Sequence, residues 1–92
     1  MLPKTIINSE ITKQVIRSSG SVGVNYIEAN ESLSKKDYAF RVKICRKEAK
    51  ETLYWLKLLD VKGEGLVKKQ RELVVEITEL MKIFGSIKEK VK

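Results

Sequence analysis

The stretch SKKDYAFRVKICRKEAKETLYWLKLLD, residues 34–60, contains neither glycine nor proline and predicts one long helix. Ser34 can cap its first free N–H groups, and Asp37, three residues on, resembles the acidic member of a capping box. One side of this helix carries Tyr38, Val42, Cys45, Ala49, Leu53 and Leu56, and a second side carries Phe40, Ile44, Trp55 and Leu58. Because apolar groups cover more than half of its circumference, the helix must contact more than one neighbour, which predicts a helical bundle.

Two further helices are expected around this one. Apolar residues spaced by three or four from Ile11 to Leu33 predict a helix over about 8–32, which Asn8 or Ser9 can cap. After the turn VKGEG, where Gly63 is expected to end the second helix in the left-handed conformation, near-heptad apolar spacing predicts a third helix. Gly85 is expected to end that helix and leave a frayed tail. The sequence therefore predicts one all-α domain over 1–92, an antiparallel up-down bundle whose three helices cover about 8–32, 35–60 and 66–84.

The first predicted helix has weak helix formers in its middle, where glycine and serine each cost up to about 1 kcal/mol relative to alanine. Small side chains let a neighbouring backbone approach closely, and serine hydroxyls can bond to carbonyls of the preceding turn. We interpret this segment as a tight helix-to-helix contact, and its predicted packing residues are Ser18, Ser19, Gly20, Val22, Gly23 and Tyr26. A glycine-rich phosphate loop is the less favoured alternative, because GSVG at 20–23 lacks the lysine and the preceding strand of a P-loop.

The chain is basic, with 19 Lys and Arg against 12 Asp and Glu, a net charge of +7 and a pI near 9.6. Its field therefore favours polyanions such as RNA, DNA or an acidic membrane. On the remaining face of the second helix, basic side chains project within about 100° of one another with one tyrosine among them. Clustered Lys and Arg displace counterions from a phosphate backbone, while a solvated surface is the competing interpretation. The nucleic-acid-binding candidates are Lys43, Arg46, Lys47, Lys50, Tyr54 and Lys57.

The residue types disfavour catalysis, because the chain has no histidine, the commonest general base. Cys45 is expected to be a small buried hydrophobe, and Glu48 and Glu51 are expected to pair with Arg or Lys rather than hold a metal. Asn25 and Glu28 are expected to cap or to bridge to the second helix. We therefore expect no catalytic residue, no metal ligand and no cofactor. The lone cysteine, the absence of a signal-peptide pattern and the absence of a long apolar run predict a cytoplasmic protein without a membrane span.

Residues 16–59, IRSSGSVGVNYIEANESLSKKDYAFRVKICRKEAKETLYWLKLL, resemble the signature of bacterial four-helix-bundle proteins first noticed in intervening sequences of large-subunit ribosomal RNA genes. That family typically reads RS-[GT]-S-[IV]-G-A-N-Y-x-E-A, then SKK-D-F, then K-E-A-x-E-T-x-W-L. Its relatives include the accessory variability protein of diversity-generating retroelements. The resemblance implies a homo-oligomer, a pentamer in characterised members, with a basic surface and with RNA, DNA or a protein such as a reverse transcriptase as partner.

Two departures from the family pattern matter. Val24 stands where the family usually has alanine, which would crowd a close contact. Family members also carry a long helix ahead of LPK at residues 2–4, so the resemblance implies a four-helix bundle whose first helix is lacking here. Either the start is truncated, or another subunit or a rearranged tail fills that place.

Together these observations predict a non-enzymatic, oligomeric helical-bundle protein that binds structured RNA through phosphate contacts. The alternative is a protein-binding scaffold or adaptor with no nucleic-acid contact of its own. Self-association is expected in either case, because the apolar surfaces of the first two helices exceed what three helices of this size can cover.

Overall fold

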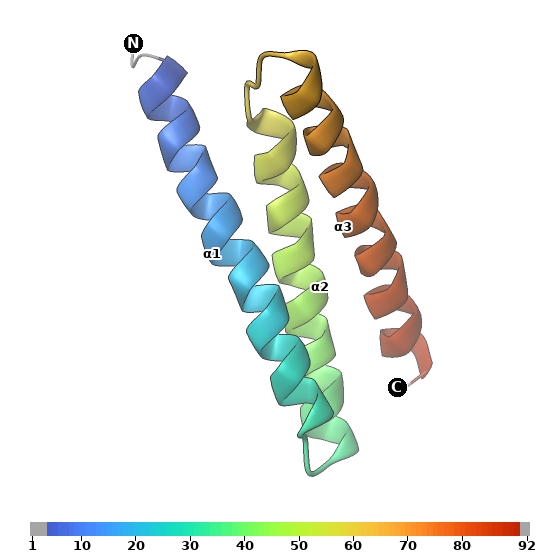
Figure 1. Cartoon of the computed structure of the whole chain (residues 1–92). Coiled ribbons are helices and arrows are strands. Elements are labelled where there is room, and N and C mark those ends of the chain that lie inside the picture. Colours follow the sequence, from blue (N-terminus) through green and yellow to red (C-terminus); the bar gives the residue numbers. More distant parts are fainter. Residues whose placement is uncertain (1–3, 91–92) are drawn as a thin grey trace.

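The computed structural model describes residues 4–90, which form three helices: α1 (Lys4–Asn30), α2 (Lys35–Leu58) and α3 (Glu64–Lys90). The chain runs down α1, up α2 and down α3, so neighbouring helices are antiparallel (Figure 1). No strand occurs within residues 4–90. The predicted all-α fold with three antiparallel helices is confirmed.

The start of α2 follows the predicted capping. Ser34 has an extended backbone (φ −144°, ψ 157°), and its side chain accepts a hydrogen bond of 3.1 Å from the Asp37 N–H. This bond satisfies one of the backbone donors that the first turn leaves without an intrahelical partner. Asp37 also places a negative charge at the positive end of the helix, which favours the same start.

The other end of α2 is fixed by side chains from both neighbouring helices. Gln70 of α3 donates from Nε2 to the carbonyls of Leu56 (2.6 Å) and Leu59 (2.8 Å). Asn8 of α1 donates to the Asp60 carbonyl (2.7 Å) and accepts from the Asp60 N–H (3.1 Å). The expected cap at Asn8 or Ser9 is wrong, because both residues lie inside α1 and Asn8 uses its amide to hold the α2–α3 loop.

Several predicted boundaries are also wrong. The first helix covers 4–30 instead of 8–32, and the second ends at Leu58 instead of residue 60, because Leu59 turns to an extended backbone (φ −66°, ψ 122°). Gly63 has the expected positive φ of 93°, but α2 has already ended at Leu58, five residues before it. Its carbonyl accepts from the Val67 N–H (3.0 Å), so Gly63 opens α3 rather than closing α2.

The predicted end of the third helix at Gly85 is wrong as well, because α3 continues to Lys90. Phe84 is buried, and Ile87, one turn later, packs against the same core. Full burial of an Ile side chain contributes about 1.5–3 kcal/mol, so the partial burial of Ile87 can offset the cost of about 1 kcal/mol for a glycine inside a helix. Of the expected frayed tail, residues 86–90 are therefore helical, and residues 91 and 92 lie outside the described part of the chain.

Small side chains form the contact between α1 and α2. Ser18 is fully buried against Thr52, whose hydroxyl donates to Ser18 Oγ at 2.7 Å, and the Ser18 hydroxyl donates to the Gln14 carbonyl at 2.8 Å. Both buried hydroxyls are thus satisfied, as burial of polar groups requires. The core cluster beside this pair draws on all three helices and consists of Val22, Ala29, Val42, Cys45, Ala49 and Phe84.

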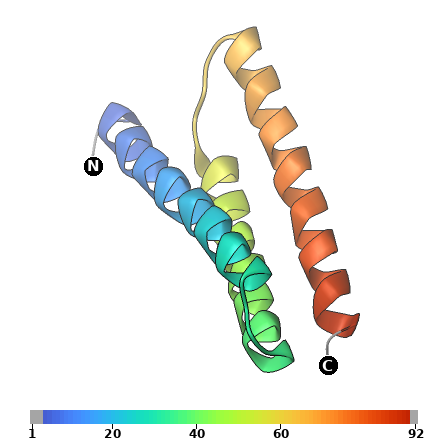
Figure 2. The same ribbon diagram turned by 60° about the horizontal axis from the view of Figure 1, so that its bottom comes forward.

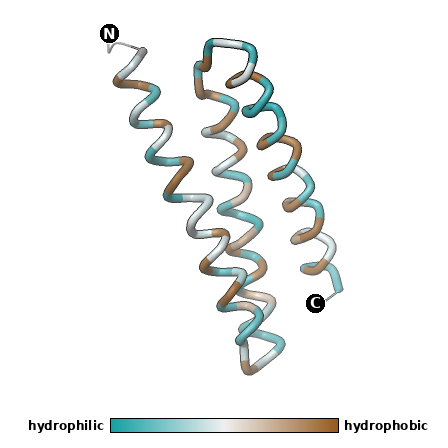
Figure 3. Tube along the Cα trace, viewed as in Figure 1, coloured by the Kyte–Doolittle hydropathy of each residue, from teal (hydrophilic) through white to brown (hydrophobic). Residues whose placement is uncertain are grey.

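The small-residue prediction holds for one side of α1 only. Ser18 and Val22 are buried, and the half-exposed Tyr26 ring lies 6.4 Å from that of Phe84. The prediction of an α1 contact at Ser19, Gly20 and Gly23 is wrong within the chain, because all three are exposed. A Cβ at either glycine would meet no described neighbour within 4 Å. This middle part of α1 is drawn nearly white, neither strongly apolar nor strongly polar (Figure 3).

The molecule is more open than its size suggests. α1 and α3 lie on either side of α2 (Figures 1 and 2), and the chain measures 47 × 22 × 19 Å. Its radius of gyration is 15.1 Å, against about 12 Å for a compact chain of this length. Its accessible surface is 6787 Å², against about 5,500 Å² for a typical monomer of 10.6 kDa. Large apolar side chains remain exposed on every helix.

Candidate nucleic-acid interface

Most of the positive charge of the chain sits on α2, which carries eight basic and three acidic side chains, a net +5 of the total +7. Exposed lysines follow one another along its outer side at spacings of four, three and seven residues, which places them on one face of a helix. We call this set the lysine face: Lys43, Lys47, Lys50 and Lys57. None of these four forms an ion pair with any residue in the range 4–90. Their charge is therefore available to a ligand.

Two carboxylates of α2, Glu48 and Glu51, are held in ion pairs by α1. Arg17 of α1 contacts Glu51 at 2.7 Å and Glu48 at 3.5 Å. The hydrogen bond that Arg17 donates to Glu51, helped by the charge of Glu48, raises the pKa of Arg17, so the guanidinium stays charged. The expectation that Glu48 and Glu51 pair with a basic residue is confirmed. Both carboxylates are thus occupied by Arg17, and the four lysines keep their positive charge without an acidic partner among residues 4–90.

Four of the five basic candidates line one surface hollow of about 540 Å³. We call it the basic hollow, and its lining residues are Phe40, Lys43, Ile44, Arg46, Lys47, Lys50 and Lys88. Arg46 is half-buried because it leans toward α3, where its Nε lies 3.5 Å from the position that a Cβ on Gly85 would take. The half-buried Arg46 and the three exposed lysines thus line the same hollow.

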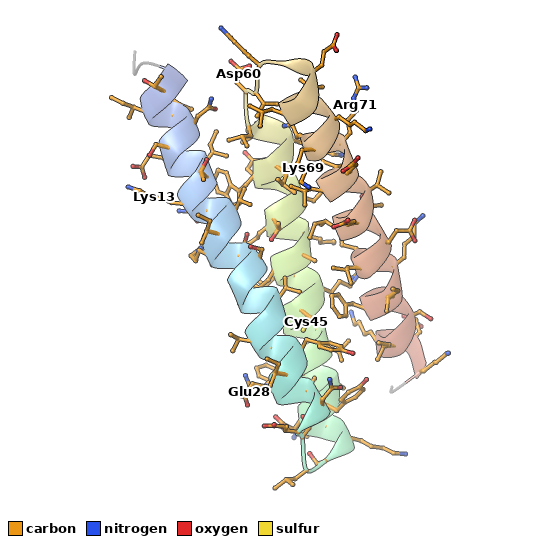
Figure 4. All side chains as sticks on the ribbon, viewed as in Figure 1. Lys13, Glu28, Cys45, Asp60, Lys69 and Arg71 are labelled. Atoms are coloured by element: carbon orange, nitrogen blue, oxygen red, sulfur yellow. The ribbon has the colours of Figure 1, made fainter. Side chains whose placement is uncertain are left out.

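Lys57 lies apart from the other basic candidates. It lines a second hollow of about 440 Å³ with Gln70, Arg71 and two valines of α3. Figure 4 shows Arg71 near the start of α3, at the same end of the molecule as Asp60. The lysine face thus meets α3 at both ends, next to Lys88 at one end and Arg71 at the other.

Tyr54, the aromatic candidate, is exposed, and its ring meets that of Trp55 edge-on, with centroids 5.0 Å apart and planes at 72°. Three residues of the basic hollow were missed from sequence: Phe40, Ile44 and Lys88. Phe40 was assigned to an apolar side of the helix, although its spacing of three and seven residues from Lys43 and Lys47 puts it on the lysine face. Lys88 could not be found, because it belongs to the segment expected to fray.

The remaining polar candidates have structural contacts. Asn25 accepts from Arg41 Nη1 at 3.2 Å, which confirms its predicted bridge to α2. Glu28 is exposed on α1 (Figure 4), and among the described residues its side chain makes no hydrogen bond to α2, so the prediction is wrong there. Cys45 is buried with its sulfur 3.7 Å from the Val22 carbonyl, and burial raises the pKa of its thiol. A thiol kept neutral in this way is a poor nucleophile.

Other kinds of site find no support in the part of the chain that the structure describes. Residues 4–90 hold no group of three or more His, Cys, Asp or Glu side chains able to bind a metal ion. Within the same range, no helix combines the length and the apolar composition that crossing a membrane requires. The basic hollow and the lysine face are therefore the features on which a functional proposal can be built.

Comparison with known proteins gives two matches. The family model described as 23S rRNA-intervening sequence protein matches residues 2–86. A crystal structure of a protein of unknown function from the S23 ribosomal protein family of Bacteroides thetaiotaomicron is 33% identical in sequence, with a TM-score of 0.75. The similarity covers 85% of this chain and 72% of that one. No curated protein matches the sequence.

Proposed function

Because the chain belongs to the family of 23S rRNA-intervening sequence proteins, we propose that it is a non-enzymatic helical-bundle protein that binds RNA through phosphate contacts from α2. The observation that carries the proposal is the row of exposed lysines without an acidic partner in residues 4–90. Lysine binds phosphate as a mobile point charge, so such a row suits the backbone of a structured RNA rather than one base sequence. Binding of this kind is governed by the release of counterions.

The direct test is a salt titration of RNA binding, followed by the fluorescence anisotropy of a labelled oligonucleotide. Four phosphate contacts to a single strand predict a slope of about −3 for log K against log salt, since each contact contributes about 0.7. The same sequence as DNA serves as the comparison for any contribution of the 2′-hydroxyl. Absence of binding at about 50 mM salt would overturn the proposal and leave the protein-binding scaffold as the better description.

We further propose that the protein self-associates, with a second copy on the exposed side of α1. This outer α1 face consists of Ile16, Gly20, Gly23, Val24 and Ile27, all exposed. Between residues 14 and 27 the only charged side chain is Arg17, which is turned toward Glu51 of α2. The accessible surface exceeds that of a typical monomer by about 1,300 Å², and a standard interface buries about 800 Å² per partner. In a closed ring, such as the pentamer that the family resemblance implies, symmetry would bury the outer α1 face of every copy against a neighbouring copy.

Substitution of the two glycines is expected to raise the stability of the isolated chain and to weaken self-association. Gly20→Ala with Gly23→Ala is expected to raise the stability of the isolated chain by roughly 1–2 kcal/mol, because alanine favours helix and the added Cβ atoms meet no neighbour. In an interface the same methyl groups hold the partner helix away, so the monomer fraction measured by light scattering should rise. Gly65→Ala is the matched control, since it lies in the first turn of α3, also in open space.

Two results would contradict the proposal. If wild-type protein is a compact monomer at micromolar concentration, self-association is wrong. If the double variant assembles as strongly as the wild type, the outer α1 face is not the interface.

A further inference from the structure

Phe40 is a large apolar side chain that is exposed on the basic face of α2. Its side chain is 56% exposed, and phenylalanine is normally among the most buried residue types. It lines the basic hollow on one side and a smaller hollow with Ser34, Lys36 and Asp37 on the other. The Arg41 guanidinium lies 6.0 Å from the ring centroid, within the range of a cation–π contact that restrains the ring. The Phe40 ring is thus restrained by Arg41 and remains accessible to a ligand.

The neighbours of Phe40 on the lysine face are arranged like those of a strand-binding surface. At a rise of 1.5 Å per residue, Lys43, Lys47 and Lys50 follow it at about 4.5, 10.5 and 15 Å along the helix axis. Tyr54, a second exposed aromatic, follows at about 21 Å. Proteins that bind single-stranded nucleic acid combine a positive groove along the backbone with aromatic side chains on which bases stack.

We propose that the basic hollow binds an unpaired segment of RNA, with one base stacked on Phe40 and the following phosphates on Lys43, Lys47 and Lys50. This inference rests on the proposed function and names the form of RNA that the site takes. In an A-form duplex the base faces are covered by their neighbours, so Phe40 would find no stacking partner. Lys88 of α3 closes the other side of the hollow and can reach the same backbone.

The proposal predicts a preference that charge alone would reverse. A duplex has the higher density of phosphates and releases more counterions per contact, so a merely basic surface favours it. We expect an unstructured 12-nucleotide RNA to bind wild-type protein at least about 5-fold more tightly than a 12-base-pair RNA duplex at the same salt, because one stacked base adds that factor or more.

Variants of Phe40 separate stacking from charge. Phe40→Leu is expected to weaken single-strand binding roughly 5- to 100-fold, while duplex binding and the salt slope stay unchanged, because no charge is removed. Phe40→Trp should retain single-strand binding. Leu66→Ala is the control for losing an exposed apolar side chain outside the hollow, and it should have no effect. Because Phe40 is mostly exposed, circular dichroism should show all these variants folded.

The outcomes distinguish this inference from the proposed function. If neither RNA binds, both are overturned. If both bind with a steep salt dependence but the duplex binds as well as the single strand, or Phe40→Leu has no effect, only the stacking inference is overturned.

Discussion

Replacing Phe84 with alanine is expected to lower the free energy of unfolding by about 3–5 kcal/mol. Phe84 is 3% exposed and is the buried residue of α3, so its ring is the main attachment of that helix to the core. It contacts the ring of Tyr26 on α1 and belongs to the cluster with Cys45 and Ala49 of α2. A domain of this size typically has about 5–14 kcal/mol of stability in total, so the variant is expected to be close to unfolding at 37 °C.

The measurement is urea denaturation followed by circular dichroism, with Leu80→Ala as the matched control. Leu80 lies one turn before Phe84 on α3 and is 36% exposed, so its truncation should cost clearly less than that of Phe84. A loss below about 1 kcal/mol for Phe84→Ala would mean that the attachment of α3 does not depend on this ring.

The same residue explains why the third helix could be predicted in type but not in length. The near-heptad apolar spacing is a local pattern and correctly indicated a helix, and Ser34 with Asp37 correctly marked the start of α2. Gly85 is also a local signal, and it predicts that the third helix ends there. What carries α3 past it is the burial of Phe84 and Ile87 against other helices, which no local pattern contains.

The small residues of α1 show the same limit in another form. Glycine and serine at 18–23 correctly indicated a close contact, but the sequence did not say on which side. Ser18 faces Thr52, whereas Gly20 and Gly23 face away from α2. Deciding between these sides requires the direction in which α2 lies, and that direction is set by the tertiary contacts of both helices.

For the candidate site, the positions of the basic residues could be predicted from the sequence, but the hollows that α3 forms beside them could not. The lysine face follows from helical spacing alone, and Lys43, Arg46, Lys47 and Lys50 indeed meet in one hollow. Lys57 was grouped with them by angle, but α3 passes close to it and gives it different neighbours. Phe40 belongs to the second apolar side predicted for this helix, and its exposure results from the absence of a described element over that part of α2.

The largest functional effect is expected from reversing three charges, Lys43→Glu with Lys47→Glu and Lys50→Glu. Each lost phosphate contact removes about 0.7 from the salt slope, so the slope should become shallower by about 2. At 0.1 M salt the same loss corresponds to about 100-fold in affinity, and repulsion by the new carboxylates adds to it. All three lysines are exposed and outside ion pairs with described residues, so the fold should be retained within about 0.5 kcal/mol.

The matched control reverses Lys68, Lys69 and Lys82, three exposed lysines of α3 outside the basic hollow. Both triple variants lower the net charge from +7 to +1, because each changes three positive charges to negative ones. If binding depends on the basic hollow, only the α2 variant loses about 100-fold in affinity for RNA. The charges changed in the control are too distant to act, since fields from exposed charges are screened over about 10 Å at this salt. Equal losses in the two variants would show that RNA responds to overall charge and that α2 holds no binding site.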